Sequence, residues 1–315
     1  MNLVNPVDLY FYVAGLAIQA SEGGLEFGIR NDSGNVSGAG GSALPITNGK
    51  VYNFDWNYNG GLRVGFGGYI DHDAWNLELN YTWVHFSNYR SVALSSSSIV
   101  IPLWATGADT PTPVFGRGAS AGWNGDYHVI DGWMGKPYHV SRYFVVNPLF
   151  GVRFAIIDQD YNVDYSGINS RSEMNAKNNF WGIGLRGGLN MDWICAKEWK
   201  FFGTLAASLL RGHFAMNQSF VLPSSTFNTS GLHSHFWNTS PVIDMALGVE
   251  WGKHFNCDKA HVAVRAAYEF QEWFDQFQVR KIFSGGLAAN NGLGNDALRS
   301  NFSLNGFSLA LQFDF

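Results

Sequence analysis

The C-terminal segment Phe307–Phe315 constrains the fold of this chain more than any other stretch. Its odd positions are all apolar, whereas its even positions carry Ser308, Ala310, Gln312 and Asp314. This period of two predicts a β-strand with one apolar and one polar face. An open sheet edge of this kind invites aggregation, but a closed membrane barrel pairs its last strand with its first. The segment therefore predicts an all-β, transmembrane antiparallel barrel.

The composition agrees with this prediction. Of 315 residues, 46% are hydrophobic, 16% are aromatic and only 14% are charged, against a usual charged share of about 25%. The most apolar run, Phe201–Leu210, is far shorter than the roughly 20 residues of a membrane helix. The net charge of −5 and the absence of a basic run give nucleic acid no electrostatic basis for binding.

Alternating hydrophobicity recurs along the chain. Val7–Gln19 is apolar at both parities, so its facing stays open. Pro148 lacks a backbone donor and predicts a bulge or a later strand start, and a change of parity before Phe307 predicts a bulge at Gly306. With the first strand, the predicted total is ten: Val7–Gln19, Trp56–Phe66, Trp75–Trp83, Tyr127–Lys136, Phe144–Ile156, Trp181–Trp193, Phe201–Leu209, Ile243–Trp251, Val262–Phe270 and Phe302–Phe315.

The connections alternate between long and short. The predicted long loops are Ser21–Tyr52, Asn88–Gly125, Asp158–Asn179, Met216–Thr239 and Asp275–Ser300. The predicted short turns are Asp71–Asp73, Pro137–Arg142, Cys195–Glu198 and Asn256–Lys259. An even strand number places both termini with the turns, as in bacterial barrels with periplasmic turns and extracellular loops. We expect residues 1–315 to form a single barrel domain.

The segment Asn88–Gly125 contains an apolar cluster, Ile99–Trp104, that gains about 25 cal/mol per Å² by leaving water. We expect this segment to fold partly back into the lumen and narrow it. The alternatives are that it packs against another loop on top of the barrel, or that it forms two more strands and raises the count to twelve.

Tryptophans gather near the predicted strand ends. Indole rings favour the membrane interface, so two girdles are expected, made of Trp56, Trp75, Trp83, Trp133, Trp181, Trp193, Trp199, Trp251 and Trp273.

Charged residues at the polar parity should face the lumen. These are Arg63, Glu78, Asp131, Arg153, Arg186, Asp192, Asp244, Glu250, Arg265 and Glu269. They predict either a charged constriction that sorts solutes or an ion-pair network that fills a small barrel. Inward glycines, namely Gly65, Gly67, Gly182, Gly184 and Gly248, leave space and favour the open path.

Enzymatic chemistry has little support in the sequence. Asp71-His72-Asp73 falls in a predicted periplasmic turn, and His213, His233 and His235 are interpreted as polar loop residues. No Ser/His pair indicates a nucleophile with its base, and no spacing indicates a metal or cofactor site. Cys195 and Cys257 lie in separate turns, so a disulfide and two free thiols both remain possible. No cleavable signal precedes Asn5-Pro6-Val7, so we expect a mature chain.

Several short motifs occur together: Leu62–Gly67, Asn80–Trp83, Gly151-Val152-Arg153, Phe180–Arg186 and Phe313-Asp314-Phe315. In this order they resemble the Legionella-type pore-forming major outer-membrane protein family, which is shared with chlamydia-like bacteria. A final amphipathic strand ending in Phe is also similar to the insertion mark of outer-membrane barrels. The resemblance implies a porin-type barrel in the bacterial outer membrane, in contact with lipid, that lets small hydrophilic solutes diffuse. The alternative is a closed structural or adhesive barrel whose loops bind a partner or host surface; the oligomeric state is left open.

Overall fold

A computed structural model describes residues 7–32, 49–70, 75–95, 98–104, 116–167, 171–221, 229–255, 260–284 and 293–315. Within these residues, ten long strands form the wall of a barrel. They are β1 (Val7–Glu22), β4 (Tyr58–Ile70), β5 (Trp75–Ala93), β7 (Gly116–Gly135), β9 (Phe144–Gly167), β10 (Arg171–Ile194), β11 (Trp199–Val221), β12 (Thr229–Phe255), β13 (Ala260–Ser284) and β14 (Leu293–Asp314). The predicted fold class and the count of ten are confirmed.

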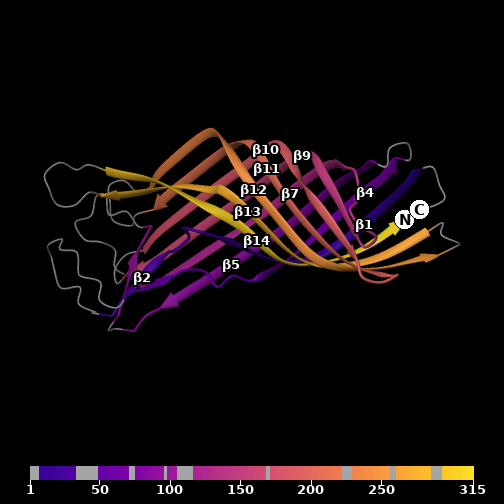
Figure 1. The fold of residues 1–315 in the computed structure, drawn as a ribbon. Helices are drawn as coiled ribbons and strands as arrows, with labels where there is room; N and C mark the ends of the chain where they lie inside the picture. The colour runs from indigo at the N-terminus through magenta and orange to yellow at the C-terminus, as the bar shows by residue number, and fades with distance from the viewer. Residues whose placement is uncertain are drawn as a thin grey trace.

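Each wall strand pairs antiparallel with its neighbours in the order β1-β4-β5-β7-β9-β10-β11-β12-β13-β14. The ring closes because β1 also pairs with β14, in a register that joins Tyr10 with Asp314 and Glu22 with Phe302. Figure 1 shows the resulting inclined strands, with both marked ends of the chain at one end of the barrel. No edge of the wall is left open. A membrane requires this closure, because backbone donors and acceptors at an open edge would have no hydrogen-bond partners in lipid.

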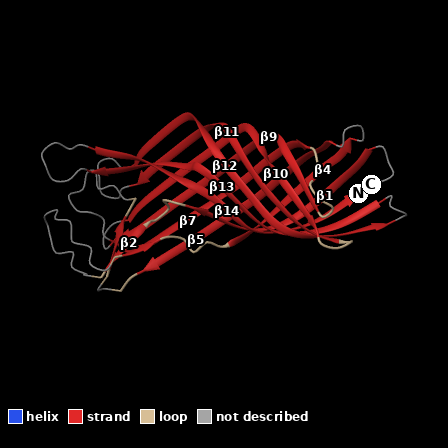
Figure 2. Ribbon diagram, in the orientation of Figure 1, coloured by secondary structure: helices blue, strands red, loops and turns tan. Residues whose placement is uncertain are grey.

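Four short strands lie outside this ring. β2 (Gly28–Asn31) pairs with both β3 (Lys50–Tyr52) and β6 (Ile99–Pro102). β8 (Tyr138–His139) pairs with β9 beside a turn. Because β6 has four residues and only one pair with the wall, at Val100 and Gly116, the alternative of twelve barrel strands is wrong. Figure 2 shows the all-strand architecture of the described chain.

The outward face of the wall changes character along each strand. On β9 the outward positions are apolar from Phe144 to Ile156 and polar from Asp158 to Ser166. Thirteen residues at about 3.3 Å each, inclined at about 45°, give an apolar band roughly 30 Å tall, which is close to the height of a membrane barrel's lipid face. The predicted outward residues Leu77, Leu79, Ile183, Leu185, Met245 and Leu247 are all exposed, which confirms that facing. No helix among the described residues is long and apolar enough to cross a membrane.

Beyond this band the strands continue, and here the predicted loops were too long. β9 and β10 extend to Gly167 and from Arg171, and β11 and β12 extend to Val221 and from Thr229. The predicted loops Asp158–Asn179, Met216–Thr239 and Asp275–Ser300 are therefore mostly hairpin arms. The polar outward side chains of these arms led to the prediction of loops, but strands that leave the membrane are polar outside and apolar inside.

The predicted bulge at Gly306 is wrong. The change of parity that led to it has the same cause, namely the inversion of the apolar face along the strand. The pairing of β14 with β1 runs without interruption from Asn305 to Phe307. Phe302 and Leu304 are apolar because they face the interior, whereas Phe307 and Leu309 face lipid. The prediction of a bulge or later start at Pro148 is also wrong, since β9 begins at Phe144 and pairs regularly with β10. The β7 ladder ends at Leu149, so β7 has no residue paired with Pro148.

The interior of the outer half is an aromatic core. Its rings come from the wall and from the described, inward-folded parts of two connections, the one between β1 and β4 and the one between β5 and β7. Neighbouring rings lie 4.4–6.4 Å apart between centroids, as in Phe86–Trp123 at 4.4 Å and Tyr161–Phe277 at 6.4 Å. We call these residues the aromatic core: Phe27, Phe54, Trp56, Phe86, Trp104, Trp123, Tyr127, Tyr161, Phe180, Phe214, Trp273, Phe277 and Phe302. A wall that is polar outside needs such a core, because nothing else buries its apolar side chains.

The segment that was expected to fold back does so in its described part. Trp104 is 3% exposed and stacks edge-on against Tyr161, an inward residue of β9, at 5.6 Å between centroids. Its backbone N–H donates to the Tyr165 hydroxyl at 3.2 Å and its indole N–H donates to the Glu26 carbonyl at 2.8 Å. Trp104 is therefore buried inside, while β6 pairs with β2 of another connection, as the alternative of packing against another loop expected. The narrowing of the path stays a prediction, and residues 105–115 lie outside the described chain.

Candidate functional site

The inner half of the barrel contains a cavity of about 710 Å³. It reaches from the turn end, at Pro137 and Ala196–Trp199, up to Tyr127 and Gln271 near the middle of the wall. All ten charged residues that were predicted to face the lumen line this cavity. Of the aromatic core, Tyr127 alone lines it, so the cavity ends where the core begins.

One group of ion pairs crosses the top of the cavity. The Arg153 guanidinium donates to both oxygens of Asp131, at 2.6 and 2.8 Å, and to both oxygens of Asp244, at 3.0 Å each. Arg186 also pairs with Asp244. Arg153 is 1% exposed and lies 5.7 Å from the Trp273 ring centroid. Two arginines and two aspartates balance in charge, which a dry site requires.

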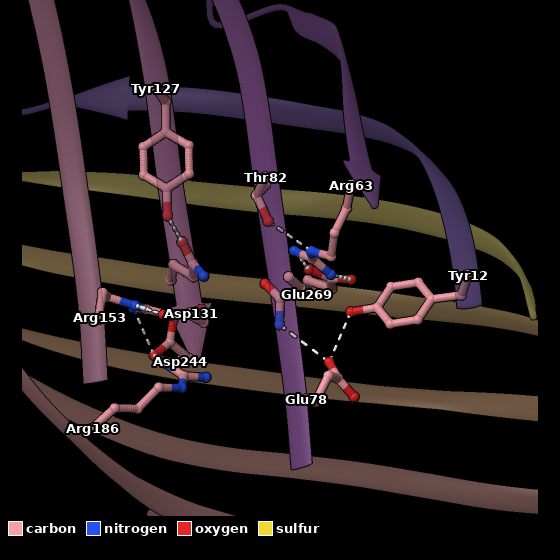
Figure 3. Close-up of polar contacts among 12 residues, drawn as sticks. Tyr12, Arg63, Glu78, Thr82, Tyr127, Asp131, Arg153, Arg186, Asp244 and Glu269 are labelled. Carbon is pink, nitrogen blue, oxygen red and sulfur yellow. Dashed lines mark hydrogen bonds and ion pairs between the residues drawn. The ribbon is translucent and has the colours of Figure 1, made fainter. Parts of the chain in front are cut away.

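A second group joins Arg63 of β4 with Glu269 of β13, the strand next to β12, which carries Asp244 (Figure 3). Arg63 donates to both oxygens of Glu269, at 2.8 Å each, and its Nε donates to the Thr82 hydroxyl at 2.9 Å. This fork geometry is the strong, orienting form of the arginine–carboxylate pair. It joins β4 with β13, which are separated in the wall by β1 and β14, so it fixes the width of the lumen there.

Glu78 is held in a different way, by neutral donors. The hydroxyls of Tyr10 and Tyr12 donate to its two carboxylate oxygens at 2.8 and 2.9 Å, and the Asn80 amide donates at 3.1 Å. Sequence reasoning missed both tyrosines because the facing of the first strand was left open. Their signal is the parity of β1, whose even positions from Tyr10 to Glu22 all face inward.

Nearer the turns, the remaining charges form a chain. Lys200 lies 3.1 Å from Glu250 and 3.4 Å from Asp192, and Arg265 lies 3.3 Å from Glu250. The arginine stacks on Phe202 at 4.3 Å from the ring centroid. Lys200, Asp192 and Arg265 are partly exposed to the cavity, so water screens their charges, whereas Glu250 is buried. Lys200 was not among the predicted lumen residues.

The inward glycines do not leave an open path, and that expectation is wrong. A Cβ on Gly65 would lie 2.3 Å from the Tyr12 ring, and a Cβ on Gly67 would lie 2.3 Å from the Tyr10 ring. At Gly182 and Gly248 the rings of Phe180 and Phe202 lie 2.7 Å from such an atom. At Gly184 the added atom would meet the Leu209 carbonyl oxygen at 2.0 Å. The glycines admit aromatic rings and neighbouring backbone rather than solute.

The predicted tryptophan girdles divide into two groups. Trp75, Trp83, Trp181, Trp193, Trp199 and Trp251 lie on the outward side or at the turn rim. The prediction is wrong for Trp56, Trp133 and Trp273. Trp133 lines the cavity, whereas Trp56 packs on Trp123 and Trp273 is fully buried in the aromatic core. Proximity to a strand end could not separate the two faces; strand parity could.

The other candidate residues lie away from the cavity or outside the described chain. His213 faces outward, as do His233 and His235. Cys195 is an exposed free thiol. Asp71-His72-Asp73 and Cys257 fall outside the described residues. Among the residues that the structure describes, no group of three or more His, Cys, Asp or Glu side chains could hold a metal ion.

The closed ten-strand wall, its lipid-facing apolar band and its charged interior define a bacterial outer-membrane β-barrel. The sequence matches a family described as Legionella pneumophila major outer membrane protein precursor over residues 15–315, and the chain belongs to this family. Its location is the bacterial outer membrane, where the apolar band contacts lipid.

A comparison with curated protein sequences gives no match. Among solved structures, the outer membrane protease OmpT from Escherichia coli aligns with a TM-score of 0.46 and 9% identity, covering 100% of this chain and 99% of that one. The toluene transporter TodX of P. putida aligns at 0.31 and 7% identity over 99% and 92%. A FadL homologue from Pseudomonas aeruginosa aligns at 0.25 and 9% identity over 99% and 90%. Likeness at this level carries no argument about function.

Proposed function

We propose that this chain is a diffusion channel for small hydrophilic solutes, and a transport protein rather than an enzyme. The observation that carries the proposal is the cavity of about 710 Å³ lined by charged residues and reaching the turn end of the barrel. Buried charge is costly unless it is paired, so a barrel that served only as a scaffold would be more stable with an apolar filling. A polar chamber on the axis is what a hydrated solute needs.

The aromatic core determines what passage requires. It closes the outer half, and its wall rings are fixed by strand pairing on both sides. Trp104 belongs instead to the inward-folded segment 98–104, whose pairing is with β2 and with one residue of β7. Leu103 adds a backbone bond to Phe27 at 3.4 Å. In this proposal, displacement of segment 98–104 opens the path, so conductance is small and intermittent.

The cavity lining gives little reason for strong selection by charge sign. Arg63 is matched by Glu269 and Arg153 by Asp131, within hydrogen-bond distance in each case. A solute crossing the cavity meets both signs in fixed positions and replaces its hydration with paired donors and acceptors. We therefore expect small neutral and zwitterionic solutes to pass together with ions.

Conductance in planar bilayers tests the proposal. The full chain is compared with Trp104→Ala, with a variant lacking residues 93–112, and with Trp193→Ala as the matched control, since Trp193 is an exposed, outward tryptophan that does not line the cavity. Heat-dependent gel migration shows whether each barrel has folded. We expect small, rare openings from the full chain and from the control, and larger or more frequent openings from the other two variants.

The second candidate is a closed barrel that acts through its outer end on a partner or host surface. The aromatic core favours it, because Trp123, Trp273 and Phe302 are fully buried across the interior. If all four folded proteins fail to conduct, this candidate replaces the channel. Conductance that is equal in all four would keep the channel but refute the role of segment 98–104.

A further inference from the structure

A patch of ring and guanidinium donors faces outward on three adjacent strands, where the apolar band ends. His213 of β11 is in register with Trp181 of β10 and with Trp237 of β12. Two residues closer to the apolar band on β11 is Arg211, in register with Ile183 and Thr239. His235 stacks on His213 at 5.7 Å between ring centroids. We call these five residues, Trp181, Arg211, His213, His235 and Trp237, the Arg211 patch.

The donors of this patch are unused within the described chain. Arg211 is exposed, and its one contact is a marginal 3.5 Å approach to the Thr239 hydroxyl. No described carboxylate pairs with it, and neither His213 nor His235 makes a hydrogen bond to a described residue. An outward charged pair farther along β10 and β9, Lys177 with Asp160 at 3.2 Å, is complete in itself. The patch therefore offers a fixed positive charge and several N–H groups, and no anion to accept them.

Outward histidines elsewhere on the wall differ. On β5 and β7, the Nδ1 of His85 lies 3.0 Å from an Asp126 oxygen, and the Nδ1 of His128 lies 2.8 Å from the Tyr81 hydroxyl. Those imidazoles have partners supplied by the protein. The histidines of the Arg211 patch have no such partners among the described residues, although the patch lies at the same kind of boundary between apolar and polar outward residues.

The position of Arg211 at the end of the apolar band favours an anion of the membrane as its partner. Below it on β11 the outward residues are Leu209, Ala207 and Leu205, which face lipid tails. An arginine costs about 2–4 kcal/mol at the bilayer midplane and little at the interface, and its long side chain reaches toward headgroups. A guanidinium binds phosphate through two parallel N–H donors, and indole rings favour the headgroup level.

We propose that the Arg211 patch binds the phosphate of a phosphorylated glycolipid headgroup in the outer leaflet. Arg211 supplies the charge and the forked contact, His213 and His235 donate to the remaining phosphate oxygens, and Trp181 and Trp237 flank the sugar and the first acyl carbons. The site is independent of the cavity, because the inward and outward side chains of β11 alternate and no patch residue lines the interior.

Native mass spectrometry of the full chain in detergent micelles tests the proposal, with bisphosphorylated lipid A as the probe. The comparison lipids are the dephosphorylated form with the same acyl chains and, as a competitor, inorganic phosphate. Arg211→Gln is compared with Arg171→Gln, whose arginine is also exposed on a wall strand but pairs with Asp164 at 2.8 Å. His213→Ala/His235→Ala is compared with His85→Ala. Heat-dependent gel migration confirms that every variant is folded.

We expect Arg211→Gln to weaken binding of lipid A by about tenfold, which corresponds to about 1.4 kcal/mol, and the double histidine variant to weaken it several-fold. Arg171→Gln and His85→Ala should bind as the wild type does. Wild type should hold the dephosphorylated lipid as weakly as Arg211→Gln holds lipid A. Equal binding by Arg211→Gln, or equal binding of the dephosphorylated lipid, overturns the proposal. Displacement of lipid A by inorganic phosphate would also overturn it, because the site would then be a general anion site.

Discussion

Removal of the Arg153 side-chain charge is the sharpest test of the ion-pair group above the cavity. Arg153→Met keeps most of the side-chain volume and removes four hydrogen bonds of 2.6–3.0 Å to Asp131 and Asp244. Asp244 keeps Arg186 as its partner, whereas Asp131 loses its cation in a buried site. Breaking a buried pair by removing one partner costs about 3–5 kcal/mol.

The double variant Arg153→Met/Asp131→Asn isolates the cause of that cost. It removes one charge of each sign and leaves the Arg186–Asp244 pair intact. If the cost of the single variant comes from an unmatched buried carboxylate, the double variant should be more stable than Arg153→Met by about 2 kcal/mol. If the cost came only from lost packing or lost hydrogen bonds, the second substitution would destabilise the barrel further.

Urea unfolding in lipid vesicles, followed by tryptophan fluorescence, measures these differences. With a slope of about 3 kcal/mol per molar urea, Arg153→Met should lower the unfolding midpoint by about 1 M or more, and the double variant should recover roughly half of that shift. Arg171→Met is the control, because its arginine lies in an exposed pair, and its midpoint should not move. A single variant as stable as the wild type, or a double variant less stable than the single one, would refute the reasoning.

Three further predictions concern the wall. Leu185→Arg should lower the stability of the barrel by about 2–4 kcal/mol, because Leu185 is 68% exposed and two residues from the centre of the outward apolar run Trp181–Trp193; an unchanged urea midpoint would argue against lipid contact. Gly184→Val should cost about 1–3 kcal/mol, because its Cβ would lie 2.0 Å from the backbone oxygen of Leu209, whereas Gly187→Val, with only one atom at 3.9 Å, should cost less in the same assay. Cys195, an exposed thiol at a turn, should react with an impermeant maleimide only after the outer membrane is permeabilised; labelling of intact cells would reverse the predicted orientation of the barrel.

The barrel wall could be predicted from the sequence because a period of two is a local signal. Leu77 and Leu79, or Ile183 and Leu185, are separated by one inward residue, so parity alone assigns their facing. The same parity placed Arg63, Asp131 and Arg153 beside the lumen. The strand order follows from the connections, since consecutive antiparallel strands joined by short turns are neighbours.

The occupants of the interior could not be predicted in the same way, because they come from distant parts of the chain. Trp104 packs on Tyr161, and Tyr10 and Tyr12 donate to Glu78. These contacts form because the barrel closes and a connecting segment folds inward, and no local sequence pattern predicts them. Trp273 was assigned to a girdle because it is near a strand end, although its parity with Gln271 and Glu269 places it inside. The inward glycines were interpreted as free space because a missing side chain does not reveal which ring takes its place.

The change of hydrophobic face along single strands connects the fold with its proposed function. On β14, Phe307 and Leu309 are apolar on the outside, whereas Phe302 and Leu304 are apolar on the inside. The inner half can have a charged, hollow interior because lipid covers its apolar face. The outer half has polar outward residues, so its stability depends on an interior apolar core. A wide permanent opening through that core would remove the burial that holds the outer wall together. Segment 98–104, which contributes Trp104 to the core and pairs only with β2 and with one residue of β7 among the described residues, is therefore the least costly part to displace. Under the proposed channel function, control of the path lies in the inward-folded segment 98–104, and the wall strands stay fixed.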